Sequence, residues 1–299
     1  MMNCMECLLS IIQMGKRQVK DIFVKVKKQV FGPNGMLKVN FIIKLTLVII
    51  NKTSFSKVNK KFNLLLLNFM KKKINIQEIV SKMKININKI TIKTFHFNFI
   101  QVNTLVIHDD TKEAVIVDPG NSNPQEDAAL LEYIQKENLK IRCIVNTHPH
   151  IDHVLGNSFC KKSFNAPLLT HKAGMPIYEQ SIAYGSTFGF TQTEFPTPDQ
   201  FITEKDQIIF GNQKWTIIET PGHADGSVCF YDAENKFVIV GDVLFEGGIG
   251  RTDLPTGNYD MLISNIQNKL MTLPEDVLVI PGHADTTTII TEKNTNPYL

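Results

Sequence analysis

The stretch Thr147-His148-Pro149-His150-Ile151-Asp152-His153 places four possible metal ligands within six residues, directly after the apolar run Cys143-Ile144-Val145. Three imidazoles and a carboxylate at the end of a strand cannot all be ordinary core residues, because each buried polar group needs a hydrogen-bond partner. Nitrogen and oxygen ligands without a thiolate suit zinc, iron or manganese. A surface loop that is merely rich in histidine is the alternative for this stretch alone.

The spacing of the four side chains leaves room for two ions. His148 and His150 alternate along an extended segment, so both can face one ion. Asp152 and His153 lie a step further on and can face a second. Asp152 also falls where a helix is expected to begin, a position that favours an anion.

Three more apolar runs downstream each lead to a possible ligand. The runs are Trp215–Ile218 before His223, Lys236–Val240 before Asp242, and Val277–Ile280 before His283. A glycine precedes each of these ligands and allows the turn that carries the side chain back over the strand ends. One Gly-His or Gly-Asp pair is weak evidence, because turns also use these residues. Four strands with this layout predict a single site at one edge of a sheet.

Strands and helices are also predicted upstream of the histidines. Ala114–Val117 reads as a buried strand that stops at Asp118, and Gln101–His108 reads as the strand before it. Asn123 and Pro124 predict a helix start. That helix is expected to turn its apolar face inward through Leu130, Leu131 and Ile134. Between Ala166 and Gln200, several prolines predict a loop-rich cover over the site, with His171 as a structural residue.

Charge divides the chain unevenly. Residues 1 to 82 contain 16 Lys and Arg against 3 Asp and Glu, a net charge of +13, whereas residues 83 to 299 contain 16 against 26, a net charge of −10. The acidic portion argues against a nucleic-acid partner. It is long enough to form one domain with a well-buried core.

Residues 1 to 82 follow no steady helical or strand periodicity. We expect them to be an extension, disordered or read through from a false start, and residues 83 to 299 to form the domain. The longest apolar run, Phe41–Ile50, is about half the ~20 residues that a membrane-spanning helix needs, so we expect no membrane partner. The five cysteines form no framework, which indicates a reducing, cytoplasmic compartment.

The ordered set of polar residues at the strand ends resembles the ligand set of the metallo-β-lactamase superfamily of hydrolases. The set comprises Asp118, His148, His150, Asp152, His153, His223, Asp242 and His283. Within the superfamily, Pro221–Ser227, Gly248–Pro255 and the C-terminal Glu292–Leu299 are similar to the short bacterial type of glyoxalase II, the hydroxyacylglutathione hydrolases. The resemblance covers about Lys84 to Leu299 and none of the extension.

This resemblance implies an α/β (α+β) fold, a four-layer αββα sandwich with the site at one edge between the two sheets. It also implies two divalent metal ions, zinc first, with iron or manganese as alternatives. His148, His150 and His223 would hold the first ion, Asp152, His153 and His283 the second, and Asp242 would bridge them. Asp118 would be a structural carboxylate beneath the site. The residue types agree with this ligand assignment, since seven ligands divide into two sets of three with one carboxylate left over.

The resemblance further implies hydrolysis of a small-molecule thioester of the S-lactoylglutathione type. A water shared by two cations becomes hydroxide near neutral pH, and one cation can polarise the scissile carbonyl. Asp152 would be catalytic by orienting that hydroxide. Arg251 lies nine residues after Asp242, where these enzymes carry a cationic substrate contact. A solvated arginine is the alternative.

Other functions within the superfamily stay open. The chain ends 16 residues after His283, without the helical domain that contacts glutathione in longer glyoxalase II enzymes, which leaves the thiol carrier undetermined. A mono-iron persulfide dioxygenase is the runner-up, because its members resemble this chain at Gly250–Asp253. True β-lactamases are disfavoured because Asp242 occupies the bridging position. A metal-binding protein without catalysis is the alternative from another class, and the oligomeric state is not indicated.

Overall fold

The computed structural model describes residues 24–29, 40–45, 84–87, 90–185, 189–190 and 195–299. The chain divides into two compact units, Met1–Asn75 and Ile76–Leu299. In the first unit, strands β1 (Val24–Gln29) and β2 (Asn40–Leu45) pair antiparallel. That residues 1 to 82 are an extension and residues 83 to 299 form the domain stays a prediction.

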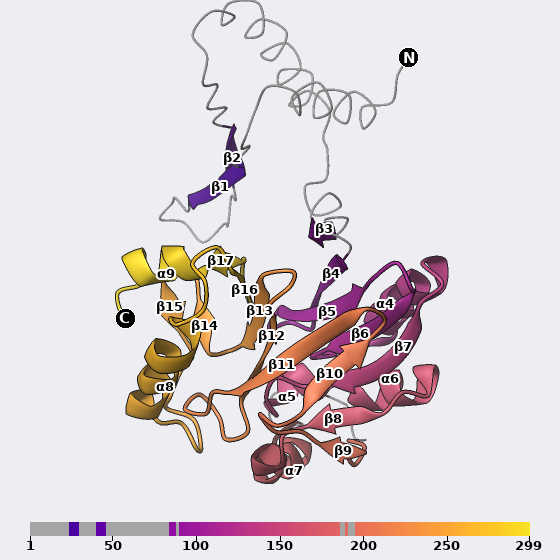
Figure 1. Cartoon of the computed structure of the whole chain (residues 1–299). Helices are drawn as coiled ribbons and strands as arrows, with labels where there is room; N and C mark the ends of the chain where they lie inside the picture. Colours follow the sequence, from indigo (N-terminus) through magenta and orange to yellow (C-terminus); the bar gives the residue numbers. More distant parts are fainter. Residues whose placement is uncertain (1–23, 30–39, 46–83, 88–89, 186–188, 191–194) are drawn as a thin grey trace, which may run out of the picture. The chain divides into compact units, whose positions relative to one another are not determined.

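Two large sheets form the centre of the second unit (Figure 1). The first sheet contains, in spatial order, β3 (Lys84–Ile87), β4 (Ile90–Phe97), β5 (Val102–His108), β6 (Glu113–Val117), β7 (Lys140–Val145), β8 (Leu168–Thr170) and β9 (Gln200–Phe201). The second contains β10 (Gln207–Phe210), β11 (Gln213–Glu219), β12 (Val228–Asp232), β13 (Phe237–Gly241), β16 (Leu278–Pro281) and β17 (Thr287–Thr288). A separate hairpin pairs β14 (Leu244–Phe245) with β15 (Gly248–Ile249).

Helices cover the outer faces of both sheets (Figure 1). Those on the first sheet are α4 (Pro124–Lys136) and α6 (Asn157–Phe164), and those on the second are α8 (Tyr259–Asn265), the π-helical η3 (Ile266–Leu270) and α9 (Ile289–Thr295). Short α5 (Ile151–Val154), the 3-10 turn η1 (Lys172–Gly174) and α7 (Met175–Gly185) complete the unit. Helix, sheet, sheet and helix are the four layers that the sequence predicted.

Strand alternation explains why three separate cores hold these layers together. In β6, Val115 and Val117 face the core between the sheets, whereas Ala114 and Ile116 face the core beneath α4 and α6. Strand β13 likewise divides its side chains between the inter-sheet core and the core beneath α8 and α9. Full burial of such an aliphatic side chain stabilises the fold by about 1.5–3 kcal/mol relative to exposure. Strands covered on both faces therefore read as continuous apolar runs.

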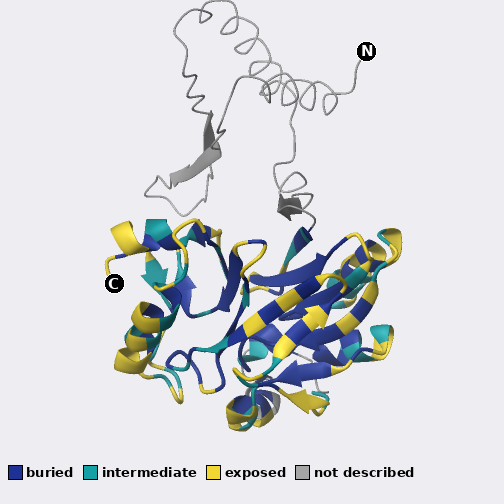
Figure 2. Ribbon diagram, viewed as in Figure 1, coloured by how far each residue is buried: buried dark blue, intermediate teal, exposed yellow. Residues whose placement is uncertain are grey.

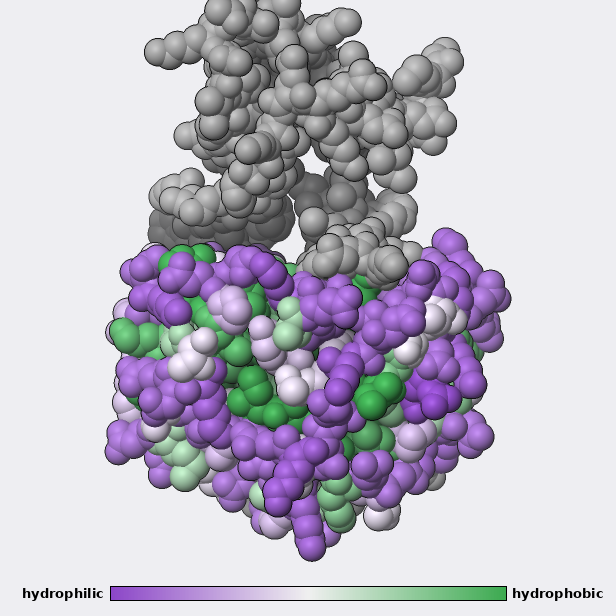
Figure 3. Space-filling view, viewed as in Figure 1, coloured by the Kyte–Doolittle hydropathy of each residue, from purple (hydrophilic) through white to green (hydrophobic). Residues whose placement is uncertain are grey.

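The solvent-facing edge of the second sheet follows the opposite pattern. Strands β10 and β11 alternate buried and exposed residues, visible as blue and yellow bands in Figure 2. The molecular face in Figure 3 is mostly hydrophilic, with apolar side chains gathered between α8 and β11. No helix within the described ranges is long and apolar enough to cross a membrane.

Two local predictions need correction. The cap of α4 is as predicted, since Asn123 Oδ1 accepts from Gln125 N and Glu126 N, but Leu131 is half-buried and Tyr133 takes its place in the core. The segment expected to be loop-rich contains the eleven-residue helix α7. Pro176 does not break that helix, because it lies in the first turn, where backbone N–H groups have no intrahelical acceptor.

Strand direction brings the predicted site together. Strands β6 and β7 are parallel in the first sheet, and β13 and β16 are parallel in the second. The carboxyl ends of parallel strands meet at one edge of a sheet, which is where open α/β sheets place their sites. The chain leaves these four ends at Asp118, Asn146, Asp242 and Gly282.

Candidate metal centre

The first group of candidate ligands consists of His148, His150 and His223, whose possible ligand atoms lie within 4.8 Å of one another. His223 Nε2 is 2.9 Å from His150 Nδ1. His148 and His150 come from the loop after β7, and His223 comes from the loop after β11, so the two sheets both contribute. We call these three residues the first triad.

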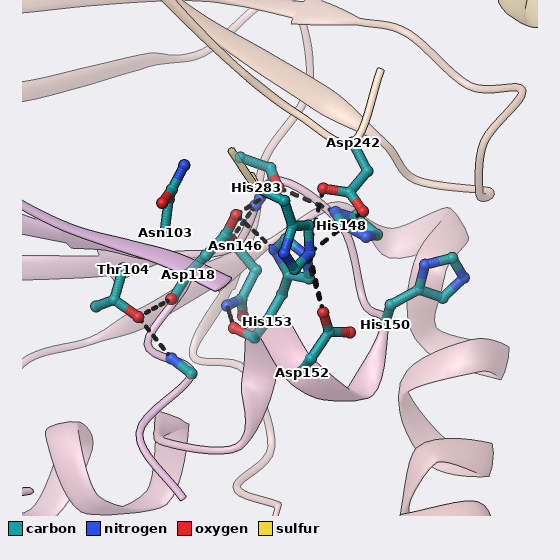
Figure 4. Close-up of polar contacts among 12 residues, drawn as sticks. Asn103, Thr104, Asp118, Asn146, His148, His150, Asp152, His153, Asp242 and His283 are labelled. Atoms are coloured by element: carbon teal, nitrogen blue, oxygen red, sulfur yellow. Dashed lines mark hydrogen bonds and ion pairs between the residues drawn. The ribbon is translucent and has the colours of Figure 1, made fainter. Parts of the chain in front are cut away.

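The second group consists of Asp152, His153 and His283, called here the second triad. Asp152 Oδ2 lies 3.4 Å from His153 Nε2 and 3.1 Å from His283 Nε2. The two imidazole Nε2 atoms are 3.2 Å apart. Figure 4 shows Asp152 below the two rings and Asp242 above them.

Asp242 contacts members of both triads. Its Oδ2 lies 3.9 Å from His223 Nε2 and 3.5 Å from His283 Nε2, and its Oδ1 lies 3.5 Å from His153 Nε2. A carboxylate can offer one oxygen to each of two ions, so the geometry is compatible with a bridging ligand. The bridging role of Asp242 stays a prediction.

The donor atoms fit metal ions by two independent criteria. Two ligands held about 2.1 Å from a tetrahedral ion are about 3.4 Å apart, and four contacts inside the triads run from 2.9 to 3.4 Å. Within the described part of the chain, His148 Nε2 and Asp242 Oδ1 are buried without a hydrogen-bond partner. Such orphaned atoms are costly unless they bind something. These clusters can hold divalent metal ions.

Asp118 fixes the orientation of two imidazoles from beneath. Its Oδ1 accepts from Thr147 N at 2.7 Å, and its Oδ2 accepts from Thr147 Oγ1 at 2.6 Å and from His153 Nδ1 at 3.0 Å. Because the Thr147 hydroxyl gives its proton to Asp118, it accepts from His148 Nδ1 at 3.0 Å. His148 and His153 therefore carry protons on Nδ1, and their Nε2 atoms face the site.

Burial keeps the first triad neutral. It lowers the pKa of His148 well below its ordinary value, with help from the neighbouring histidines. Burial and the adjacent His223 lower the pKa of His150 to about 4. The pKa of His223 is also lowered by burial, although Asp242 opposes the shift. Neutral imidazoles are the form that binds metal.

The second triad is charged. Burial would lower the pKa of His153, but Asp152, Asp242 and Asp118 outweigh it and raise that pKa well above its ordinary value. Burial also opposes charge on His283, yet its bond to Asp152 raises the pKa. Burial would raise the pKa of Asp152, but His153 and His283 hold it below its usual range. A cation can take the place of these protons beside the carboxylates.

Comparison with known proteins agrees with this geometry. Residues 97–283 match the model of the Metallo-beta-lactamase superfamily. The chain belongs to the metallo-β-lactamase superfamily. It is 35% identical over 201 residues to "Hydroxyacylglutathione hydrolase GloC" of Haemophilus influenzae, and the match covers 67% of this chain and 93% of that protein.

Two solved structures are also similar. One is the BLEG-1 B3 metallo-beta-lactamase, with 32% identity, a TM-score of 0.63, and coverage of 70% of this chain and 99% of that chain. The other is TTHA1623 in a di-iron-bound form, with 31% identity, a TM-score of 0.62, and coverage of 69% and 99%. These matches confirm the predicted fold class.

Sequence reasoning missed the amide side chains that hold the ligand loop of this superfamily member. Asn98 Nδ2 donates to the main-chain oxygen of Asp152 at 3.2 Å, and Asn146 Nδ2 donates to that of His153 at 3.1 Å. Asn146 is locked in turn by reciprocal bonds with Asn157. Asparagine after a strand is so common in turns that its position alone could not reveal this role.

The glycine before His283 is required by crowding. A Cβ on Gly282 would collide with Asp242 Oδ1 and lie 2.7 Å from His153 Cε1. Its φ is not in the left-handed region, unlike that of Gly222 at +131°. The prediction that glycine serves to make a turn therefore holds for Gly222, whereas Gly282 makes room between two ligands.

Arg251 contributes to the site through its main chain. Its carbonyl oxygen accepts from His223 Nδ1 at 2.8 Å. The lone pair of His223 is therefore on Nε2, the atom that faces His150. Its side chain is 60% exposed and forms a two-pronged ion pair with Asp253, with both N–O distances at 2.7 Å. His171 lies outside both triads and contacts Glu219 at 3.2 Å.

Proposed function

We propose that this chain holds two divalent cations and hydrolyses small 2-hydroxyacyl thioesters such as S-lactoylglutathione. The observation that carries the proposal is the pair of triads joined by Asp242, with ligand-to-ligand spacings that suit metal ions. The relative named hydroxyacylglutathione hydrolase supports the substrate class. Zinc is the first choice of metal, and the similar di-iron-bound structure supports iron as an alternative.

Cations in the two triads would supply a water acidic enough to attack near neutral pH and a Lewis acid for the scissile carbonyl. The protein's own contribution is orientation. Asp118 and the Arg251 carbonyl fix the imidazole tautomers. Asp152, kept ionised by His153 and His283, can accept a hydrogen bond from the attacking water. A thiolate leaves without needing a proton, so a general acid is dispensable.

The proposal is tested on the purified full chain by metal analysis combined with three activity assays. We expect about two metals per chain and hydrolysis of S-lactoylglutathione. One iron per chain with oxygen uptake on glutathione persulfide would instead support the dioxygenase. Turnover of a β-lactam without thioester hydrolysis would support a lactamase.

Alanine variants of single histidines should separate the two metal sites. His150→Ala is expected to deplete the first triad and His283→Ala the second, each leaving about one metal per chain, because each triad keeps its three ligands without the other. His171→Ala is the matched control, since this histidine contacts Glu219 outside both triads. Metal analysis after dialysis measures the outcome. Loss of both metals in either variant would contradict two separable sites.

Arg251→Ala should raise KM for a carboxylate-bearing thioester about two- to five-fold, the range for an exposed ion pair, with kcat nearly unchanged. Alanine keeps the main-chain carbonyl that accepts from His223, so the metal content should not change. Asp253→Ala is the matched variant, because it frees the guanidinium that Asp253 now holds. Its KM is expected to be no higher than that of the parent. A higher KM in both variants would mean that the ion pair itself shapes the site.

A further inference from the structure

We infer that α9 and its C-cap residue are positioning elements for the first triad, because Glu292 of α9 and the C-cap Asn296 hold the β14–β15 hairpin whose exit orients His223. The inference rests on the proposed metal centre and adds two residues that are distant in sequence from His223. Glu292 and Asn296 belong to the C-terminal segment that resembles glyoxalase II and that the proposed chemistry leaves without a role.

Glu292 is a fully buried carboxylate that accepts hydrogen bonds from the hairpin turn, from β17 and from Asn296. Its Oε2 accepts from Gly247 N at 3.0 Å and from Asn296 Nδ2 at 2.8 Å, and its Oε1 accepts from the Thr287 hydroxyl at 2.5 Å. A buried carboxylate with three donors is strongly tied to its surroundings. It anchors the turn between β14 and β15 to the last helix.

Asn296 completes the anchor. It is 6% exposed, and its Nδ2 donates to Gly248 O at 3.0 Å in addition to Glu292. Two main-chain groups of the turn, Gly247 N and Gly248 O, are thus held by Glu292 of α9 and by Asn296, the residue that caps the end of this helix. Leu244 of the hairpin also packs in the same core as Ile289 of α9.

The hairpin leads directly to the ligands. After β15 ends at Ile249, Gly250 passes so closely that an added Cβ would collide with the main-chain oxygen of Asp242 and lie 3.0 Å from His223 Nδ1. The next residue, Arg251, supplies the carbonyl that accepts from His223 Nδ1 at 2.8 Å. Since β14 and β15 form their own two-stranded sheet, the side chains of α9 help to determine where this carbonyl lies.

A matched clamp serves the second triad. Asn103 Nδ2 donates to Pro281 O at 3.0 Å and to Ala284 O at 2.9 Å, and Asn103 N donates to Gly282 O at 2.7 Å. These bonds hold the loop on both sides of His283. Truncation of Asn103 should therefore weaken metal binding by the second triad, and truncation of Asn296 should weaken metal binding by the first. General destabilisation of the fold cannot produce this difference.

The test measures Zn²⁺ affinity by competition with a chromophoric chelator in the full-length chain. Each truncation is made in a His283→Ala background, which keeps the first triad, and in a His150→Ala background, which keeps the second. We expect Asn296→Ala to weaken Zn²⁺ binding about ten-fold or more in the first background, in line with the loss of an outer hydrogen-bond partner, and to leave the second background nearly unchanged. Asn103→Ala should give the reverse pattern.

Glu292→Gln is the conservative control. Its amide oxygen can accept from Gly247 N and Asn296, and its amide nitrogen can donate to the Thr287 hydroxyl. The Zn²⁺ affinity of Glu292→Gln should therefore stay near that of the parent. Glu292→Ala should lose as much Zn²⁺ affinity as Asn296→Ala. If Glu292→Ala does not fold, Asn296→Ala carries the test, because it removes an uncharged side chain and leaves Glu292 with its bonds from Gly247 N and the Thr287 hydroxyl. Equal losses in both backgrounds, or no loss in the first, would overturn the inference. Zn²⁺ binding by a parent without thioester hydrolysis would overturn the proposed reaction alone.

Discussion

Asp152→Asn is expected to lower the turnover of S-lactoylglutathione by about 10²- to 10⁴-fold, the contribution of a well-placed proton acceptor. Asparagine still offers a neutral oxygen to a cation, but it lacks the negative charge that attracts and orients a water proton. The charge is present in the native site, because His153 and His283 hold the pKa of Asp152 below its usual range. Asp152→Asn should therefore lose turnover to a much greater extent than it loses bound metal.

The measurement pairs steady-state kinetics with metal analysis of the same preparation. We expect the metal content of Asp152→Asn to stay well above half that of the parent, since His153 and His283 remain. Asp276→Asn is the control, because this carboxylate is exposed and pairs with Lys236 on the surface. If activity and metal disappear in parallel, Asp152 serves as a ligand and its orienting role is wrong.

Asp118→Asn is expected to reduce both stability and metal binding without a change in side-chain volume. The carboxylate accepts from Thr147 N, the Thr147 hydroxyl and His153 Nδ1. An amide has one acceptor oxygen, so at least one buried N–H would face its NH₂ group. An unsatisfied buried donor lowers the free energy of unfolding by about 1–3 kcal/mol, which corresponds to about 2–4 °C in Tm per kcal/mol for a domain of this size.

The same substitution should weaken metal binding by the second triad about 10- to 100-fold, because the His153 ring loses the acceptor that fixes its tautomer. Thermal unfolding of the metal-free chain and Zn²⁺ titration in the His150→Ala background measure the two effects. Thr147→Val provides the comparison, since it removes the hydroxyl between Asp118 and His148 and should act on the first triad instead. Unchanged Zn²⁺ affinity in Asp118→Asn would show that His153 is held by packing alone.

The sequence alone could predict which side chains would meet, because each candidate ligand lies shortly after a strand. Apolar runs of strand length mark β6, β7, β11, β13 and β16, and the residue types after them are those that bind divalent metals. The order of these features carried the resemblance that predicted the layered fold. Strand periodicity and helix caps can be recognised without a structure, because they depend on residues that are close together in the chain.

Helix α7 shows where local signals misled. The prolines and glycines of the segment from Ala166 to Gln200 indicated loops. Packing against the loop that follows β7 nevertheless supports a helix, as the bond from the Ser181 hydroxyl to Pro149 O at 3.3 Å illustrates. Tertiary contacts of this kind outweigh weak propensities. The same limit applied to Leu131 and Tyr133 in α4, because the exact face of a helix is set by the sheet beneath it.

Only the tertiary structure revealed how the ligands are held. His153 meets His283 across 130 positions of the chain, and the Arg251 main chain, rather than its charged side chain, meets His223. Glu292 and Asn296 reach the centre through a hairpin, without touching a ligand themselves. The sequence shows directly which residue types could bind a metal. The partner that orients each of them depends on sheet register and on packing between distant segments. Every residue has a backbone carbonyl, so the sequence cannot show which carbonyl will accept a hydrogen bond from a histidine.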